Sequence, residues 1–385
     1  MQFKIKIFFP IGAFYPSQIG GPCNSLYWHT YGLNKHGIKI DIVTTTIGIK
    51  KGLVKKNVSY DNECGTVFYG EGNERSIKII KKALKITRSA DIIHLNSLFN
   101  FISIIVFFYA KIFCKNKPIV WSVRGELNEK AIIYSKWKKI MVLFFYKLFS
   151  RNVVFHGTSN QEIKDICSHF KNSKVIQIPN LIKPFDRIFQ DGIKKNLLFV
   201  GRIHPIKAIH KIIEGLSLSE KFLNSDFNFI LIGDYEDRYK YYFEDLILLI
   251  EAKGLKDKIE FKGYLGGYEK ERIYAESYAT LLMSDTENFG NVVTESLNQG
   301  TPVITSKGTP WSILEEFNCG YCVSNEPSII AKTIDLILNL KQDQYLKMRK
   351  NAIQLVEYKF NINSQIYRWL IQYEALYNTN KQAVE

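Results

Sequence analysis

The chain has 385 residues, of which 46% are hydrophobic and 23% charged, so it is long enough for two domains and too apolar for intrinsic disorder. Its formal net charge is +15, and the excess lies in residues 1–180, which carry 27 Lys and Arg against 10 Asp and Glu. This asymmetry favours an acidic partner for the first half, such as a membrane face, a phosphorylated lipid or a nucleic acid, although Lys-rich codon usage explains it equally well.

Apolar runs rich in Ile, Val and Phe alternate with longer amphipathic stretches along the chain, which predicts parallel sheets with helices on both faces. The runs read as strands at 4–10, 39–45, 91–97, 117–123, 152–159, 196–203, 227–234, 258–264, 278–284 and 302–307. Prolines, a glycine and charges in segment 179–196 indicate a linker. The expected fold is α/β, with two doubly wound parallel-sheet domains facing one another across a cleft.

The sequence does not favour a signal peptide, a membrane-spanning helix or a metal site. The N-terminus reads as an opening strand rather than a signal peptide, because its short apolar run carries lysines. The apolar run 98–113 is too short to cross a membrane and reads as a buried helix. Cys319 and Cys322 form a C-x-x-C pair without further ligands at suitable spacing, so no metal site is expected.

Ligands of open α/β sheets lie beyond the carboxyl ends of the strands, so the loops there are the candidate sites. After the first strand, Gly20 and Gly21 open a helix, where close backbone approach and helix amides favour an anion. An ordinary turn is the alternative. After strand 196–203, Arg202 and Lys207 precede a helix, and two cations beside a helix start form a phosphate site. Two solvated surface cations are the alternative.

The third candidate loop is TENFGNVVTES, residues 286–296, between a predicted strand and a short helix. The chain turns at Phe289 and Gly290, and the amides of Asn291, Val292 and Val293 begin the helix, ready for an anion. Glu287 and Glu295 are hydrogen-bond acceptors suited to sugar hydroxyls, and Glu295 to the diol of a ribose. The two acids would then hold the two ends of a nucleotide sugar, unless Glu295 only complements the helix dipole.

These motifs carry a family resemblance. The chain resembles the group 1 (family 4) glycosyltransferases in five segments. They are GRIHPIK (201–207), ENFGNVVTE (287–295), the following SLNQGTPVITS, IPNLI (178–182) and the last helix. The resemblance implies the GT-B fold, with an acceptor-binding domain at 1–185 that is completed by a C-terminal helix at 361–385, and a donor-binding domain at 186–360. It also implies a retaining enzyme that uses a nucleotide sugar, here a UDP- or GDP-sugar, without a metal cofactor.

The resemblance assigns roles to the candidate residues. Arg202 and Lys207 would hold the diphosphate and stabilise it as it leaves. Glu287 would contact the donor sugar and Glu295 the ribose. The amides near Asn291 to Val293 and the loop of Gly20 and Gly21 would complete the phosphate cradle, and Gly263, Tyr264 and Leu265 would lie near the base.

The first domain departs from the family pattern. Many members place a His after the strand 117–123, whereas this chain has SVRGEL, with Arg124 and Glu126. An Arg-Gly pair at this place resembles some capsule and O-antigen enzymes. Arg124 and Glu126 are both acceptor-side candidates. His94, at the end of strand 91–97, is a third candidate, and a buried core histidine is its equally good alternative.

Two helical stretches, 75–88 and 130–151, hold most of the positive charge, and the second also carries Trp137 and several Phe. Basic aromatic helices are typical of peripheral contact with an anionic membrane, although a packed helix with a wet face is the alternative. Together with these helices, the family resemblance implies a cytoplasmic, peripherally membrane-associated hexosyltransferase of lipopolysaccharide O-antigen or capsule biosynthesis, with a lipid-linked saccharide acceptor.

Three other functions remain open. The first is a GT-B transferase acting on a soluble sugar phosphate or small molecule. The second is an inactive nucleotide-sugar-binding subunit, and retention of both cations and both acids argues against it. The third is a basic nucleic-acid-binding protein, which is disfavoured because the charge lies on helices and no RNA-recognition sheet motif is present.

Overall fold

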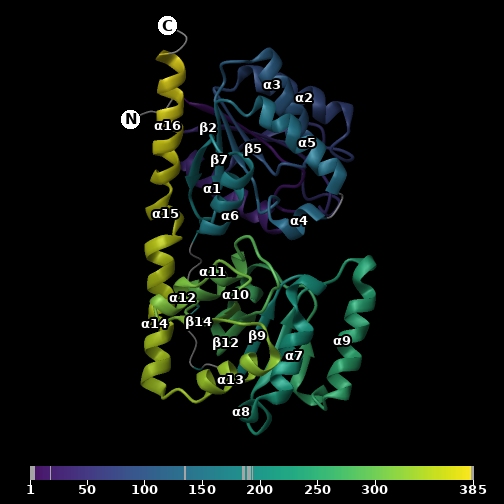
Figure 1. The fold of residues 1–385 in the computed structure, drawn as a ribbon, viewed down its shortest axis with the longest axis vertical. Helices are drawn as coiled ribbons and strands as arrows, with labels where there is room; N and C mark the ends of the chain where they lie inside the picture. The colour runs from purple at the N-terminus through teal and green to yellow at the C-terminus, as the bar shows by residue number, and fades with distance from the viewer. Residues whose placement is uncertain are drawn as a thin grey trace. The chain divides into compact units, whose positions relative to one another are not determined.

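A computed structural model describes residues 5–17, 19–133, 136–183, 187–188, 192 and 194–382. The chain divides into two compact units (Figure 1). One comprises Met1–Lys183 with Ile362–Glu385, and the other comprises Pro184–Asn361. The end of the chain thus belongs to the unit that holds its beginning.

The first unit contains an eight-stranded sheet in the order β3-β4-β2-β1-β5-β6-β7-β8. All neighbouring strands are parallel except the β3–β4 pair, a hairpin that the strand pattern did not predict. The strands are β1 (Lys6–Pro10), β2 (Lys39–Thr45), β3 (Ser59–Asn62), β4 (Gly65–Gly70), β5 (Ile92–Asn96), β6 (Ile119–Ser122), β7 (Val153–Gly157) and β8 (Lys174–Gln177). The chain passes from one side of β1 to the other between β4 and β5.

Helices cover both faces of this sheet. They are α1 (Gly21–Lys35), α2 (Ile77–Ser89), α3 (Phe101–Phe113), α4 (Glu129–Ile133), α5 (Lys136–Phe149), α6 (Asn160–His169), α15 (Ile362–Gln365) and α16 (Tyr367–Gln382). Alternate residues of β1 enter two separate cores, as the pleat of a strand requires. Phe8 packs with α2, α3, α5 and α6, whereas Phe9 packs with α1 and with Trp369 and Tyr373 of α16.

The second unit contains a six-stranded, fully parallel sheet in the order β11-β10-β9-β12-β13-β14. Its strands are β9 (Asn196–Val200), β10 (Asn228–Ile232), β11 (Ile259–Phe261), β12 (Ala279–Leu282), β13 (Val303–Ser306) and β14 (Gly320–Val323). The chain builds outward from β9 through β10 and β11, then returns to the other side of β9 to begin β12. The carboxyl ends of β9 and β12 therefore flank the topological switch point, where such sheets bind ligands.

The helices of the second unit connect these strands. They are η1 (Pro205–Lys207), α7 (Ile209–Leu218), α8 (Glu220–Leu223), η2 (Asp237–Tyr239), α9 (Lys240–Ala252), η3 (Lys256–Lys258), α10 (Gly267–Glu276), α11 (Asn291–Asn298), α12 (Ile313–Glu316), α13 (Pro327–Leu338) and α14 (Gln342–Lys359). The β9 and β10 loops approach so closely that a Cβ at Gly233 would lie 1.8 Å from the carbonyl oxygen of Gly201. None of the helices within the described residues is long and apolar enough to cross a membrane.

Candidate active site

The loop that leaves β9 places two cations at the switch point. Arg202 follows directly after the strand and its end glycine, and Lys207 is the last residue of the 3-10 helix η1. The side chain of His204 caps η1 by accepting a hydrogen bond from the Ile206 amide at 3.0 Å. Ala208 then takes a left-handed conformation, with φ of 50°, and α7 begins. Lys207 is therefore held by a short, capped turn, and Arg202 lies in the segment just before it.

Lys207 forms an ion pair with Glu287, which belongs to the loop after β12. The side chains are 15% and 18% exposed, so the pair lies largely out of the solvent. The hydroxyl of Ser284 lies 3.4 Å from the same carboxylate oxygen, and the Glu287 amide donates to the Gly308 carbonyl at 2.9 Å. One cation and one acid, 80 residues apart in the chain, thus meet where the sequence predicted the leaving diphosphate and the donor sugar.

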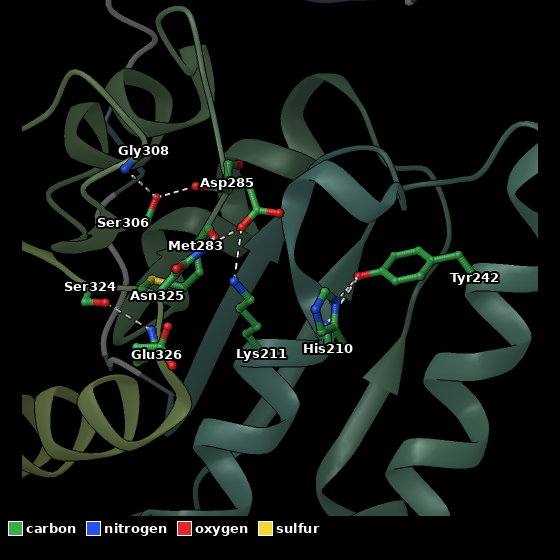
Figure 2. A network of polar contacts seen from close by, with 11 residues as sticks. His210, Lys211, Tyr242, Met283, Asp285, Ser306, Gly308, Ser324, Asn325 and Glu326 are labelled. Carbon is green, nitrogen blue, oxygen red and sulfur yellow. Dashed lines mark hydrogen bonds and ion pairs between the residues drawn. The ribbon is translucent and has the colours of Figure 1, made fainter. Parts of the chain in front are cut away.

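A polar network centred on Asp285 joins three elements of the second unit (Figure 2). Asp285 accepts hydrogen bonds from the amine of Lys211 in α7, at 3.1 Å, and from the side-chain amide of Asn325 after β14, at 2.8 Å. Its backbone amide donates to the Ile206 carbonyl of η1 at 2.9 Å. Asp285 therefore ties the turn that carries Lys207 to the loop that carries Glu287.

The sequence interpretation did not include Lys211, Asp285 or Asn325. Two local signals point to the first two residues. Asp285 directly follows the strand run 278–284, and Lys211 lies four residues after Lys207. No comparable signal exists for Asn325, since its contact with Asp285 spans 40 residues.

Replacing Asp285 by alanine is expected to lower kcat by about tenfold to a hundredfold, because small displacements of positioned groups have effects of this size. Asp285→Asn is expected to retain most of the activity, since its carbonyl oxygen still accepts from Lys211 and Asn325. Asp226, which pairs with Lys195 at 2.9 Å and is 87% exposed, is the matched control for alanine replacement. Steady-state measurement of kcat for the three variants tests this prediction. Equal loss in the Ala and Asn variants, or none in either, would contradict a positioning role.

Arg202 forms a more exposed pair with Glu236 of the β10 loop, at 3.0 Å, with side chains 50% and 43% exposed. The sequence interpretation did not include Glu236 as a partner of Arg202. An exposed pair of this kind contributes at most about 1 kcal/mol. Glu236 therefore holds Arg202 only weakly.

The helix expected after the turn is α11, and Gly290 precedes it in a left-handed conformation with φ of 79°. The Val293 amide donates to the Gly290 carbonyl at 2.9 Å, so the turn uses the amide that was expected to contact phosphate. This corrects the prediction for Val293. For Asn291 and Val292, at the start of the helix, the phosphate role stays a prediction.

Phe289, expected among the donor contacts, is only 5% exposed. Its carbonyl accepts a hydrogen bond from the indole of Trp311, and its ring packs against the rings of Trp311 and Phe360 at 5.2 and 5.8 Å. Phe289 therefore packs in the interior of the second unit and fixes the start of the turn through these contacts.

Glu295, in the second turn of α11, is not an isolated acid. Its Oε2 atom accepts from the amine of Lys270 at 3.0 Å and from the hydroxyl of Tyr274 at 3.1 Å, both in α10. Burial, and then the nearby charge of Glu295, raise the pKa of Glu271 to about 7. Both contacts of Glu295 use one oxygen, so Oε1 takes part in neither.

The expected base-binding segment follows β11 at the carboxyl end of the edge strand. Gly263 has φ of 65°, and its carbonyl accepts from the Gly233 amide at 2.9 Å. Tyr264 is 58% exposed and Leu265 is partly buried. Gly263, Tyr264 and Leu265 thus belong to the same sheet edge as the two ion pairs, two strands away from β9.

The remaining candidates lie in the first unit. Gly20 caps α1 with an extended backbone, and Gly21 and Pro22 begin the helix. The expected glycine-rich helix start is therefore present at the carboxyl end of β1. A Cβ at Gly20 would meet only the Pro22 ring, at 3.5 Å, so space alone does not require glycine there.

His94 lies inside β5 and is fully buried, as the core alternative described. Its two ring nitrogens lie 2.6 Å from the Tyr373 hydroxyl and 2.7 Å from the Ser122 hydroxyl. Burial lowers its pKa well below the usual value. Within its unit, then, His94 is a neutral core histidine.

Arg124 and Glu126 follow β6 and have different surroundings. Arg124, at φ of 60°, donates to the side-chain oxygens of Asn180 at 3.1 Å and Asn96 at 2.9 Å. Its Nε atom is buried without a hydrogen-bond partner among the described residues. The Glu126 carboxylate instead binds the Ser97 hydroxyl and the amides of residues 98 and 99, which makes it a structural cap.

The second unit matches a protein family. Residues 184–355 match the model described as "Glycosyl transferases group 1". An uncharacterized glycosyltransferase of Methanocaldococcus jannaschii is 26% identical over 261 residues, which cover 60% of this chain and 65% of the relative. The O-antigen biosynthesis glycosyltransferase WclY of Escherichia coli is 24% identical over 261 residues, which cover 68% of this chain and 64% of that protein. The matches thus span just under two thirds of these relatives.

Solved structures agree with the fold. The sucrose-phosphate synthase of Thermosynechococcus elongatus superposes with a TM-score of 0.78 at 17% identity, covering 98% of this chain and all of that one. Anabaena HepE in complex with UDP and glucose gives a TM-score of 0.76 at 16% identity, covering 96% of this chain and all of that one. Residues 184–355 of the second unit thus match the group 1 glycosyltransferases, and the two parallel-sheet units have the GT-B fold.

Proposed function

We propose that the chain is a retaining glycosyltransferase that moves a hexose-type sugar from a UDP- or GDP-sugar to a lipid-linked saccharide in O-antigen or capsule biosynthesis. The observation that carries the donor half of this proposal is the ion pair of Lys207 and Glu287 at the switch point of the second sheet. The name of the E. coli relative, an O-antigen biosynthesis enzyme, supports the pathway. The Anabaena structure with UDP and glucose supports the donor class.

In this proposal the transfer is an exchange of two bonds at the anomeric carbon. The bond from C1 to the diphosphate breaks, and its electron pair leaves on the phosphate oxygen. The acceptor hydroxyl oxygen bonds to C1, and its proton passes to the departing diphosphate. Lys207 and Arg202 stabilise the charge that develops on the diphosphate, which is where fixed cations have the largest effect. These protein cations perform the task without a metal cofactor.

Glu287 and Glu295 contact different parts of the donor in this proposal. Glu287 accepts hydrogen bonds from the donor sugar while Lys207, its partner in the structure, turns to the diphosphate. Glu295 accepts from the ribose diol, and its contacts with Lys270 and Tyr274 hold the carboxylate in place for this. Gly263, Tyr264 and Leu265 lie beside the base.

The acceptor half of the proposal rests on the first unit. Its segment 1–180 has a large excess of cations, which suits an acceptor carried on a phosphorylated lipid at the inner face of the cytoplasmic membrane. Arg124 is the candidate acceptor contact, because its buried Nε atom has no partner among the described residues and two neighbours fix its guanidinium. Gly20 and Gly21 offer helix amides at the same sheet edge.

Thermal unfolding with UDP-, GDP-, ADP- and CMP-sugars, each with and without a chelator, tests the donor half. One nucleotide class is expected to raise the unfolding temperature and to do so equally in chelator. At 100 times its dissociation constant a ligand adds about 2.7 kcal/mol to the free energy of unfolding. Arg202→Ala should weaken the shift, whereas Lys195→Ala, at an exposed pair 59% and 87% solvent-accessible, should not. A shift lost in chelator would contradict the metal-free site.

A further inference from the structure

Helix α5 of the first unit presents large apolar side chains to solvent. Leu143 and Tyr146 form its buried stripe, and the Tyr146 hydroxyl donates to the Leu98 carbonyl at 2.6 Å. A second stripe lies on the opposite side of the helix, since residues 137, 141, 144 and 148 recur every three or four positions. Its members are exposed: Trp137 85%, Met141 58%, Phe144 58% and Leu148 61%.

The exposed stripe is wider than this row and continues onto the neighbouring helix. Ile140, Phe145 and Phe149 flank it, at 43%, 45% and 42% exposure. Phe149 contacts Phe108 of α3, with ring centroids 5.9 Å apart, and the end of α3 adds Ile112 and Phe113 at 53% and 68% exposure. We call the exposed apolar residues of α5 and of the end of α3 the α5 face. Few soluble surfaces leave so many adjacent large apolar side chains in water.

The charged residues of α5 and of the end of α3 are all cations. Lys138 and Lys147 are exposed on α5 at opposite margins of the stripe, by the 100° step of a helix, and Arg151 follows the helix. The amine of Lys111 reaches the Arg151 carbonyl at 2.7 Å, which places a further cation at the junction of α3 and α5. The sequence has no Asp or Glu between Glu129 and Glu162.

We propose that the α5 face docks on an anionic bilayer surface, with its apolar side chains in the interfacial layer and its lysines at the lipid headgroups. Amphipathic helices that bind membranes combine these two features. A protein partner would need acidic residues around an apolar groove, but the single-sign rim and the long row of aromatic and aliphatic side chains match the layered chemistry of a bilayer. This names the surface that would bring the first unit to a lipid-linked acceptor, and it rests on the proposed function only for that last step.

Helix α2 shows that positive charge alone does not define this surface. It is the other basic helix that the sequence interpretation singled out, and Lys78 and Lys85 are exposed on it. Among its large apolar residues only Ile77, at 69%, counts as exposed. Helix α2 therefore offers charge without an apolar row, and it is a matched control for electrostatic attraction.

Flotation of the full chain with vesicles of phosphatidylcholine, with and without about 30% phosphatidylglycerol, tests the proposal. The protein is expected to float with the anionic vesicles and less with the neutral ones. The double variant Phe144→Ser, Leu148→Ser should weaken flotation at least about tenfold, since each buried apolar side chain contributes a factor of this order. Leu248→Ser, at a residue 64% exposed on α9, should leave flotation unchanged.

Charge variants and a fluorescence probe sharpen the test. Lys138→Glu with Lys147→Glu should weaken flotation more than Lys78→Glu with Lys85→Glu, although both pairs change the net charge equally. Trp137 is 85% exposed, whereas Trp28 is partly buried and Trp121, Trp311 and Trp369 are buried, so brominated acyl chains should quench mainly Trp137. The Trp137→Phe variant should still float with the anionic vesicles, and the quenching of tryptophan fluorescence by the brominated chains should be lost.

Three results would overturn the proposal. The first is undiminished flotation of the Phe144→Ser, Leu148→Ser variant. The second is equal weakening by the α2 and α5 charge variants. The third is a wild-type dimer that becomes monomeric in the α5 variant and does not float in either form. None of these measurements uses a sugar donor, so they are independent of the proposed transfer activity.

Discussion

Replacing Lys207 by alanine is expected to lower kcat by about a hundredfold to a thousandfold, the effect of removing one fixed group that stabilises developing charge. The structure gives the reason. Lys207 ends a capped turn at the switch point and is only 15% exposed. The backbone amide of Asp285 fixes this turn by donating to the Ile206 carbonyl. A water molecule at the vacated site would be mobile and uncharged, so it would not replace the fixed amine.

The Glu287→Ala variant is expected to fold correctly and to lose activity to a similar extent. Lys207 loses its ion-pair partner, and the donor sugar loses its hydrogen-bond acceptor. Initial rates of nucleoside diphosphate release in the presence of acceptor measure both variants, and far-ultraviolet circular dichroism checks the fold. Lys195→Ala removes an ion pair of the same chemistry at the amino end of β9 and serves as control. Full activity in either site variant would refute the assignment of the active site.

Acidification is expected to destabilise the first unit strongly, because three buried histidines share its core. His29, His94 and His156 are connected through the hydroxyls of Tyr373 and Ser122, at 3.3 Å or less. Burial lowers the pKa of each, and that of His156 falls to about 3, with the charge of Arg124 as a further cause. In the unfolded chain they titrate near their usual value of about 6.5.

The direction in which pH changes the stability follows from proton uptake by the folded and unfolded states. Above the unfolded pKa both states hold neutral imidazoles, so the histidines do not change stability with pH. Below it the unfolded state binds more protons, and the free energy of unfolding falls by about 1.4 kcal/mol per pH unit for each histidine, down to the folded pKa. Burial raises the pKa of Glu126 and Glu162 in the same unit, so these two carboxyls take up protons in the folded state and offset part of the loss.

Urea unfolding at pH 7, 6 and 5 tests this account. His94→Gln should lower stability at pH 7 and also reduce the dependence on pH by about one proton, which the loss of packing alone would not do. His36→Gln, at an exposed position after α1, is the matched control. An unchanged pH dependence in the His94 variant would show that this histidine is not held neutral.

The sequence predicted the parts of the site that short segments encode. Strand runs, glycines and helix starts lie within a few residues of one another, so local pattern is enough to place the loops of Arg202, Lys207 and Glu287 at strand ends. Their meeting follows from the sheet order, because the first and fourth strands of a doubly wound sheet are neighbours. The two-sheet α/β fold was confirmed for the same reason.

Long-range packing explains what the sequence did not predict. The network of Lys211, Asp285 and Asn325 joins three segments, and no local pattern connects them. Phe289 was expected at the donor, but the surrounding rings bury it. The stretch 130–151 is recognisably basic and aromatic, yet periodicity alone does not tell which of two apolar stripes enters the core. Packing decides it, because Leu143 and Tyr146 lie inside and leave the α5 face in solvent.

Hydrogen exchange of the full chain with and without a bound nucleoside diphosphate would locate the donor site most directly. The account predicts slower exchange in peptides that cover Arg202 to Lys207 and Glu287 to Val292, at the carboxyl edge of the second sheet. The same unit has a hollow of about 500 Å³ between α10 and β9, β10 and β11, away from these two loops, whose lining includes Asn196, Asn228 and Lys258. Protection of that lining, with unchanged exchange in the two loops, would contradict the central claim.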